Sequence, residues 1–259
     1  MESLDTTDFP RVSIFNCVSH AIDMLRFSTD SILENAGTSN FDYIVVHWNA
    51  TSEVLEYLNK LREQYPNIHI IKYETNESVG FVPNLRGMMN AGFSKGFELN
   101  DYCGLTNTDQ YFGKNWLINL VKYASPESIV NSVHITPKAI GDHVITADLG
   151  ITEYGKFNMD KFNDLYTNLY NDKLESETDR GGWLNTNTMP YLIPRKFWDL
   201  AGPWELTGIN NSTPDRRFFQ RCHDNGALFT MSHSSIVYHY EAAERTIKRP
   251  EFSKEMKYE

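Results

Sequence analysis

The chain has 259 residues, of which 41% are hydrophobic and 13% aromatic, so it can bury the core of one α/β domain. Its formal net charge of -10 argues against general nucleic-acid binding, because an acidic chain gains little from neutralising phosphates. Three distant cysteines, Cys17, Cys103 and Cys222, exclude a zinc ribbon or a disulfide scaffold and favour a reducing, cytoplasmic compartment.

The first half of the chain alternates between apolar runs typical of strands and segments with helical periodicity. Strands are expected at residues 11–18, 41–48, 67–73 and 101–107, each followed by a helix, at residues 20–37, 52–66, 83–96 and 115–124. Ser52 is a candidate N-cap and Gly37 a helix end. This order predicts right-handed crossovers and a Rossmann-like, mainly parallel sheet with helices on both faces.

The second half is less regular. After a strand at residues 128–136, residues 137–182 are polar and contain one expected helix at 159–175, which indicates an insertion or a lid. A strand at 189–198, a turn at 200–208, a helix at 214–226 and a strand at 227–240 follow. No apolar run approaches the roughly 20 residues of a membrane span, and residues 1–10 lack the apolar core of a signal peptide. We therefore expect a soluble single domain, compatible with peripheral membrane association.

Ligands of such sheets bind at the carboxyl ends of the strands, so the residues that follow each strand are the candidates for a site. They are Cys17, Val18 and Ser19, then His47, Trp48 and Asn49, then residues 76–80 and 107–109. The chain has no GxGxxG, GxxxxGK[ST], HExxH or GxSxG motif, which disfavours dinucleotide dehydrogenases, P-loop enzymes, zincins and α/β-hydrolases.

Asn107 and Asp109 alternate at the end of the fourth strand. Their oxygens could form a weak cradle for Mg²⁺ or Mn²⁺ that a diphosphate would complete. The same tripeptide is equally typical of an Asx turn or a helix N-cap. The residues by themselves favour the turn.

The order of several segments resembles the GT-A fold of family 2-like inverting glycosyltransferases. "VSIFNCVSHAIDMLRFSTDSIL", "FDYIVVHWNATSE" and "NESVGFVPNLRGMMNAG" are similar to its opening strands and helices, and "GLTNTDQYFGKNWL" to the strand that ends in the DxD motif. "IPRKFWDLAGPWE" and "PDRRFFQRCHDNG" resemble its acceptor turn and the helix with the catalytic carboxylate. The resemblance covers most of residues 1–259 and is weakest across 137–182.

The resemblance implies a division of labour. Residues 1–125 would bind a nucleotide-sugar and residues 126–259 the acceptor. The nucleotide-sugar contacts it implies are Cys17, Val18, Ser19, His47, Asn49, Asn76, Gly80, Asn84, Asn107 and Thr108. Asp109, Asn107 and His239 would bind a divalent cation, Asp215 would be the general base, and Trp183, Trp204 and Glu205 would contact the acceptor.

Three departures from the family pattern bear on these roles. Asn107 replaces the first Asp of DxD, His47 replaces the Asp that contacts the nucleotide, and Pro214 replaces the acidic residue before Asp215. Ordinary structural roles compete with the functional ones, because Asp215 is also a suitable helix N-cap and His239 a suitable edge-strand residue.

The sequence thus predicts a metal-assisted, inverting glycosyltransferase that moves a sugar from a nucleotide-sugar to a hydroxyl of a glycan or lipid-linked glycan. Two alternatives remain. A sugar nucleotidyltransferase has a related sheet, but its Gly-rich, basic loop after the first strand is absent from "NCVSHAID". A non-catalytic glycan-binding protein of the same fold would accommodate Asn107 and His47.

Overall fold

The computed structural model describes residues 9–19, 21–74, 81–137, 144–147, 149, 157–171, 177–179, 189–205 and 214–240. The strands are β1 (Val12–Val18), β2 (Phe41–His47), β3 (Ile68–Lys72), β4 (Tyr102–Leu105), β5 (Gln110–Phe112), β6 (Ser128–Thr136), β7 (Val144–Thr146), β8 (Glu177–Asp179), β9 (Tyr191–Pro194) and β10 (Leu228–His239). The helices are α1 (Ile22–Glu34), α2 (Ser52–Gln64), α3 (Phe81–Leu99), α4 (Trp116–Val121), α5 (Met159–Asn171), α6 (Arg195–Ala201) and α7 (Pro214–Asp224).

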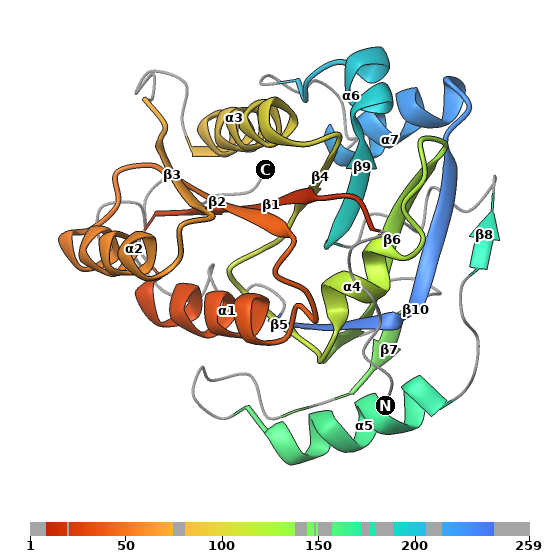
Figure 1. Cartoon of the computed structure of the whole chain (residues 1–259), viewed down its shortest axis with the longest axis horizontal. Helices are drawn as coiled ribbons and strands as arrows, with labels where there is room; N and C mark the ends of the chain where they lie inside the picture. The colour runs from red at the N-terminus through yellow and green to blue at the C-terminus, as the bar shows by residue number, and fades with distance from the viewer. Residues whose placement is uncertain are drawn as a thin grey trace.

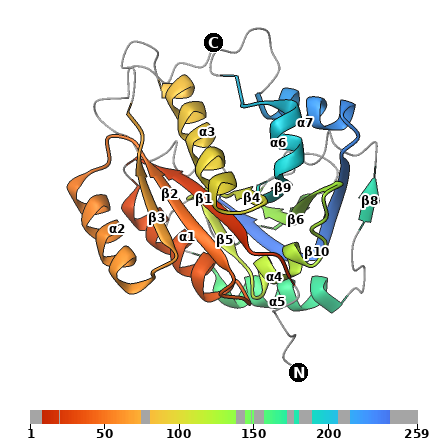
Figure 2. The same cartoon turned by 45° about the horizontal axis from the view of Figure 1, so that its top comes forward.

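All ten strands form one mixed sheet, whose main path is β3-β2-β1-β4-β9-β6-β10-β5. Strands β1, β2, β3 and β4 pair in parallel, as do β6 and β10. β9 lies between β4 and β6 and runs antiparallel to both. Helices α1, α2 and α4 cover one face and α3, α6 and α7 the other (Figures 1 and 2). The expectation of a mostly parallel sheet with helices on both faces is confirmed.

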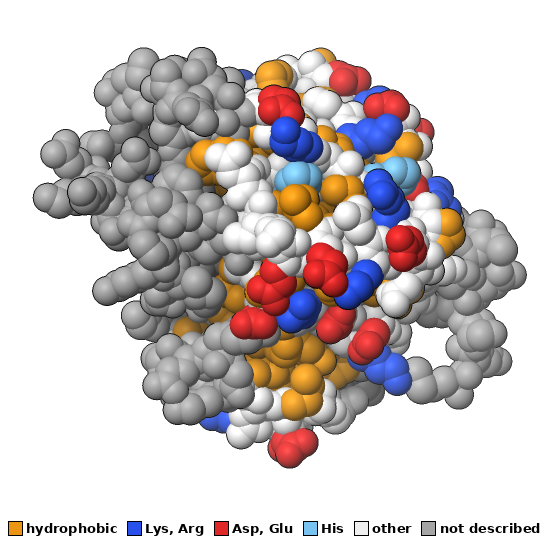
Figure 3. All heavy atoms as spheres, turned by 90° about the vertical axis from the view of Figure 1, so that its left-hand side faces the viewer, with side chains coloured by type: hydrophobic (Ala, Val, Ile, Leu, Met, Phe, Trp, Pro, Cys, Tyr) orange, Lys and Arg blue, Asp and Glu red, His pale blue; other side chains and the backbone are white. Residues whose placement is uncertain are grey.

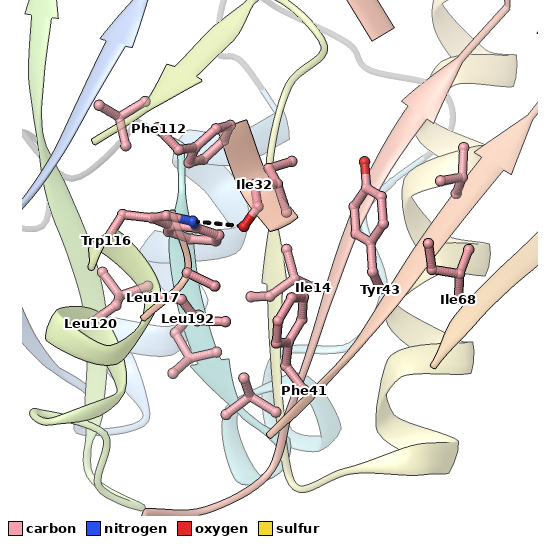
Figure 4. Close-up of a cluster of buried hydrophobic side chains, with 14 of the residues drawn as sticks. Ile14, Ile32, Phe41, Tyr43, Ile68, Phe112, Trp116, Leu117, Leu120 and Leu192 are labelled. Carbon is pink, nitrogen blue, oxygen red and sulfur yellow. Dashed lines mark hydrogen bonds between the residues drawn. The ribbon is translucent and has the colours of Figure 1, made fainter. Parts of the chain in front are cut away.

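The core has two main layers because buried side chains alternate along the strands. On β1, Ile14 packs with the α1, α2 and α4 side, whereas Phe15 packs with α3. Figure 4 shows the first layer, in which the Trp116 Nε1–H donates to the carbonyl oxygen of Ile32 at 3.2 Å. This bond allows a large ring to be buried without leaving its polar atom unpaired.

Several expectations on element boundaries are corrected. The N-cap of α2 is Thr51, whose Oγ1 accepts from the Val54 N–H at 3.4 Å, and Ser52 is instead the first helical residue. The strand expected at 189–198 is only β9, and its second part is α6. β5 was not predicted, and neither were β7 and β8 in the expected insertion.

The expected helix of that insertion is present as α5. Phe162 is buried in a third cluster, with Leu165 and Leu169 packed against it. Met159 is 37% exposed because it starts the helix.

The surface formed by α2 and β3 carries acidic and basic side chains side by side (Figure 3). Lys60 and Glu56 form an ion pair of 2.7 Å one turn apart on α2. In the part of the chain that the structure describes, no helix is long and apolar enough to cross a bilayer.

Candidate functional site

The carboxyl ends of β1, β2 and β4 meet at one edge of the sheet. Backbone hydrogen bonds join these strand ends. Trp48 N–H donates to the Val18 carbonyl at 3.2 Å, and Thr106 N–H donates to the Phe15 carbonyl at 2.8 Å. After β2 the chain turns sharply at Asn49, whose φ of 44° lies in the left-handed region that Asn tolerates better than most residues. This edge is where ligands of such sheets bind.

The segment from Thr106 to Asp109 leaves β4 and is anchored along its length. Thr106 Oγ1 donates to the Phe15 carbonyl at 3.0 Å, and Ser28 Oγ on α1 donates to the Asn107 carbonyl at 3.0 Å. The Asp109 carbonyl accepts from the Tyr240 N–H at 2.9 Å. Hydrogen bonds from three elements therefore fix the backbone that carries Asn107 and Asp109, which pre-organises those side chains.

Asp109 and His239 meet at this edge. β5 pairs antiparallel with the end of β10, with Gln110 opposite His239. As a result the His239 Nε2 lies 3.2 Å from the Asp109 Oδ1, and the two side chains are 20% and 11% exposed. No group of three or more His, Cys, Asp and Glu side chains arranged to hold a metal occurs among the described residues. A cation here would need Asn107, substrate or water as further ligands.

A second, partly buried set of contacts adjoins this pair. Gln110 Oε1 accepts from the Asn107 N–H at 2.9 Å, and Gln110 Nε2 donates to the carbonyl of Met189. The same carbonyl accepts from His134 Nε2 on β6. Burial and the nearby His239, whose ring centroid is 5.8 Å away, hold the pKa of His134 well below its usual value. His134 is thus a neutral donor, and β6, β9 and the Asn107–Asp109 segment share one hydrogen-bonded junction.

His47 ends β2 between Val18 on β1 and Lys72 on β3. It is 7% exposed, and its Nδ1 is buried without a hydrogen-bond partner among the described residues. Burial lowers the pKa of His47, and the charge of Lys72 lowers it further, while Glu74 opposes this. A neutral imidazole with an unused nitrogen therefore stands where the resemblance places a nucleotide contact.

The turn expected to contact the acceptor is held between two helices. Asn90 on α3 exchanges two hydrogen bonds with the backbone of Trp204, of 2.8 and 2.9 Å. The Glu205 carboxylate lies 2.6 Å from Arg217 Nη1 and 3.2 Å from Arg221 Nη1, both on α7. The Trp204 ring is 2% exposed and packs against Phe93 and Phe218 in the core, and its contact with an acceptor stays a prediction.

The other expected site residues fall into three groups. Asn84, Thr108 and Val18 are each 2% exposed, and Val18 is part of the core. Cys17 and Ser19 are half-buried at the end of β1. Asn76, Gly80 and Trp183 lie outside the described residues, and of Asp215 only the backbone, in the first turn of α7, is described.

Sequence reasoning missed Gln110, His134 and Asn90. Gln110 follows Asp109 directly, and His134 stands between the apolar Val133 and Ile135 in β6, which was the available signal. Their roles depend on the pairing of β5 with β10 and of β6 with β9, which no local pattern specifies.

Comparison of the fold with known structures finds 295 similar chains, among them the following three. GalNAc-T7, solved with UDP, GalNAc and Mn²⁺, superimposes with a TM-score of 0.61 and 12% identity, covering 90% of this chain and 44% of its own. S. aureus TarS 1–349 gives 0.57 and 12%, with 88% and 59% covered, and S. aureus TarS gives 0.59 and 13%, with 88% and 36% covered. No family model and no curated protein matches the sequence. The chain therefore has the GT-A fold and spans about half the length of these structures or less.

Proposed function

We propose that this chain is a metal-assisted, inverting glycosyltransferase that moves a sugar from a nucleotide-sugar to a hydroxyl acceptor. The observation that carries the proposal is the meeting of Asp109 and His239 at the carboxyl edge of β4, on a GT-A fold. An Asn in the first position of the DxD-like motif leaves one carboxylate there, and His239 adds the second protein ligand. GalNAc-T7, one chain of similar fold, was crystallised with UDP and Mn²⁺.

The donor atoms of this pair fit a divalent cation. Two ligands at right angles on an octahedral ion, with bonds of about 2.1 Å, are roughly 3 Å apart. The observed 3.2 Å between Asp109 Oδ1 and His239 Nε2 matches that spacing. An imidazole beside a carboxylate favours Mn²⁺ over Mg²⁺. A cation held there supplies Lewis-acid stabilisation of the negative charge on the departing diphosphate.

The protein groups at the edge would bind and orient the donor. His47 at the end of β2 would lie beside the nucleoside, and Asn49 shapes the turn next to it. Thr108 and Asn84 bring polar side chains to the same end of the sheet. Fixing both substrates in this way can contribute roughly 7 kcal/mol or more to lowering the barrier.

The acceptor side would be formed by α7 and the Trp204–Glu205 turn. Asp215, in the first turn of α7, would accept the proton of the attacking hydroxyl. α7 leads into β10, the strand that carries His239. A base on the acceptor side and a cation on the leaving-group side suit a single displacement, which inverts the anomeric centre. Decoration of a glycan or a lipid-linked glycan is the reaction we propose.

A donor screen tests this function. UDP-, GDP-, dTDP- and CMP-sugars are incubated with the protein with and without Mn²⁺, and hydrolysis and melting temperature are measured. We expect one nucleotide to raise the melting temperature and its sugar to be released only with Mn²⁺, and Asp109→Ala to abolish both effects. Absence of any response would contradict the proposal, and pyrophosphate release from a nucleoside triphosphate would favour a nucleotidyltransferase instead.

A further inference from the structure

Arg217 has an unused hydrogen-bonding edge. Its Nη1 lies 2.6 Å from Glu205 Oε2, which is the one ion pair that its guanidinium makes with a described residue. Its Nε and Nη2 are buried and have no hydrogen-bond partner among the described residues. Leaving buried donors of a charged group without an acceptor costs free energy, so we expect a hydrogen-bond acceptor at this edge.

Arg221, four residues later on α7, uses all three guanidinium nitrogens in hydrogen bonds to residues 201–205. Its Nε donates to the Ala201 carbonyl at 2.6 Å, its Nη2 to the Pro203 carbonyl at 3.2 Å, and its Nη1 to Glu205. Arg221 therefore anchors the turn, while only one nitrogen of Arg217 contributes to it. The unused edge of Arg217 is not required for that anchoring.

The local charge favours an anionic partner. Glu205 is one carboxylate shared by the two guanidinium groups of Arg217 and Arg221. This leaves a positive surplus around the turn, in a chain whose net charge is -10. A neutral partner such as water would satisfy the donors and leave the surplus uncompensated.

The geometry of the unused edge indicates which kind of anion would bind. Nε and Nη2 of a guanidinium point side by side and match two oxygens of one phosphate or carboxylate. We propose that Arg217 binds an oxyanion of a substrate through this edge, two residues after Asp215. The inference rests on the proposed function, because it assigns the anion to a substrate. The oxyanion belongs either to the acceptor or to the diphosphate of the donor.

The first experiment measures anion binding without donor or metal. Inorganic phosphate and methyl phosphate are titrated by calorimetry at constant ionic strength into wild type, Arg217→Lys and Arg217→Met. Arg62→Met, at an exposed arginine of α2, is the matched control. We expect saturable binding to wild type and to the control, a loss of at least about tenfold in Arg217→Lys, which keeps the charge but not the paired donors, and no binding in Arg217→Met.

A fourth variant separates the anion contact from the support of the turn. Glu205→Gln removes the ion pair and keeps Arg217, so phosphate binding should persist or strengthen. Arg217→Met and Glu205→Gln can lower the melting temperature equally, because both break the same ion pair. If only Arg217→Met then loses phosphate binding, the loss results from the missing guanidinium and not from lower stability. Equal phosphate affinity in wild type, Arg217→Lys and Arg217→Met, or no saturable binding to wild type, overturns the inference.

The second experiment identifies the source of the oxyanion. UDP with Mn²⁺ is titrated into the same variants, with and without saturating phosphate. Competition between phosphate and UDP, with UDP weakened in Arg217→Met, assigns the donor diphosphate. Simultaneous binding, with UDP affinity unchanged, assigns an anionic acceptor. Because the phosphate titration needs no nucleotide, failure of the donor screen and failure of this inference give different results.

Discussion

His239 Nε2 stands 3.2 Å from Asp109 Oδ1 because β5 runs back along the end of β10. The pairing places Gln110 opposite His239, so the residue just before β5 is brought beside the last residue of β10. The contact therefore depends on the sheet and not on a flexible loop. A site built on paired strands holds its geometry better than one carried by loops alone.

Loss of either member of this pair should remove the metal dependence of donor hydrolysis. For His239→Ala and Asp109→Asn we expect Mn²⁺-dependent hydrolysis to fall at least about 100-fold. His239→Ala removes one proposed ligand, Asp109→Asn removes the charge of the other, and even outer-shell changes cost about 10- to 100-fold. The measurements are hydrolysis rate against Mn²⁺ concentration and the melting temperature with UDP. His223→Ala, at the exposed end of α7, should behave as wild type. Unchanged Mn²⁺ dependence in His239→Ala would exclude His239 as a ligand.

Gln110 should act on the same cation through the backbone of Asn107. Gln110→Met has a similar shape but loses the bonds to the Asn107 N–H and the Met189 carbonyl, so the segment carrying Asp109 is less restrained. We expect the apparent Mn²⁺ affinity to fall about 10- to 100-fold, with a larger effect on the KM for donor than on kcat. The control is Gln220→Met, whose amide contacts only the exposed Asp224 in the described structure.

A merely structural role for Gln110 would give a different outcome. The melting temperature of Gln110→Met would fall, but the Mn²⁺ affinity at a temperature well below melting would equal that of wild type. That result would separate stabilisation of the fold from positioning of the site.

The sequence could predict the elements whose pattern is local. β1 to β4 are apolar runs bounded by turn residues, and α1 to α3 have clear helical spacing, so their order led directly to the sheet edge that holds Asp109. β5 has three residues and no pattern of its own, since it exists only because β10 is available to pair with it. In residues 189–198 the aromatic Phe197 and Trp198 follow soon after Pro194, which hid the change from β9 to α6.

The candidate site divides in the same way. Asn107, Asp109 and His47 follow strands and could be named in advance, whereas Gln110 and His134 meet at Met189 only through long-range strand pairing. Trp204 is a residue that the sequence pattern singled out but whose buried environment it did not predict. A Trp in a turn suggests a sugar contact, but the reciprocal bonds from Asn90 and the packing of Phe93 draw it into the core.

Asp42 should set the acid stability of the domain. It lies at the start of β2, where burial would raise its pKa, but hydrogen bonds from Arg11, Asn100 and His69 outweigh burial and lower the pKa to about 2 from 3.8. A lowered carboxylate pKa contributes stability that is complete above about pH 4 and is lost as the pH falls through 2.

Asp42→Asn should therefore destabilise the protein at neutral pH by about 2 kcal/mol, with a smaller difference from wild type near pH 2. Urea unfolding at a series of pH values measures this. Asp23→Asn, at a 65% exposed side chain on α1, should change stability by less than about 0.5 kcal/mol at each pH. A constant difference between Asp42→Asn and wild type from pH 7 to pH 2 would contradict the linkage.

Gly96 should be required because α3 lies very close to β4. A methyl group at Gly96 would overlap the sulfur of Cys103 and would come within 3.2 Å of the Ser13 Cβ. Alanine favours helix by about 1 kcal/mol over glycine, but overpacking a core costs about 1–3 kcal/mol. We expect Gly96→Ala to be destabilising on balance, as measured by urea unfolding.

Removal of the sulfur should reverse the effect. In the Cys103→Ala background, the methyl group of Gly96→Ala meets two Cβ atoms, those of residue 103 and Ser13, each at 3.2 Å. The substitution should then be neutral or stabilising, even though Cys103→Ala itself leaves a small cavity. A double-mutant cycle from urea unfolding should then give a favourable coupling of at least about 1 kcal/mol. A coupling near zero would mean that α3 shifts away from the sheet to accept the methyl group, and the close approach would not be a constraint on this position.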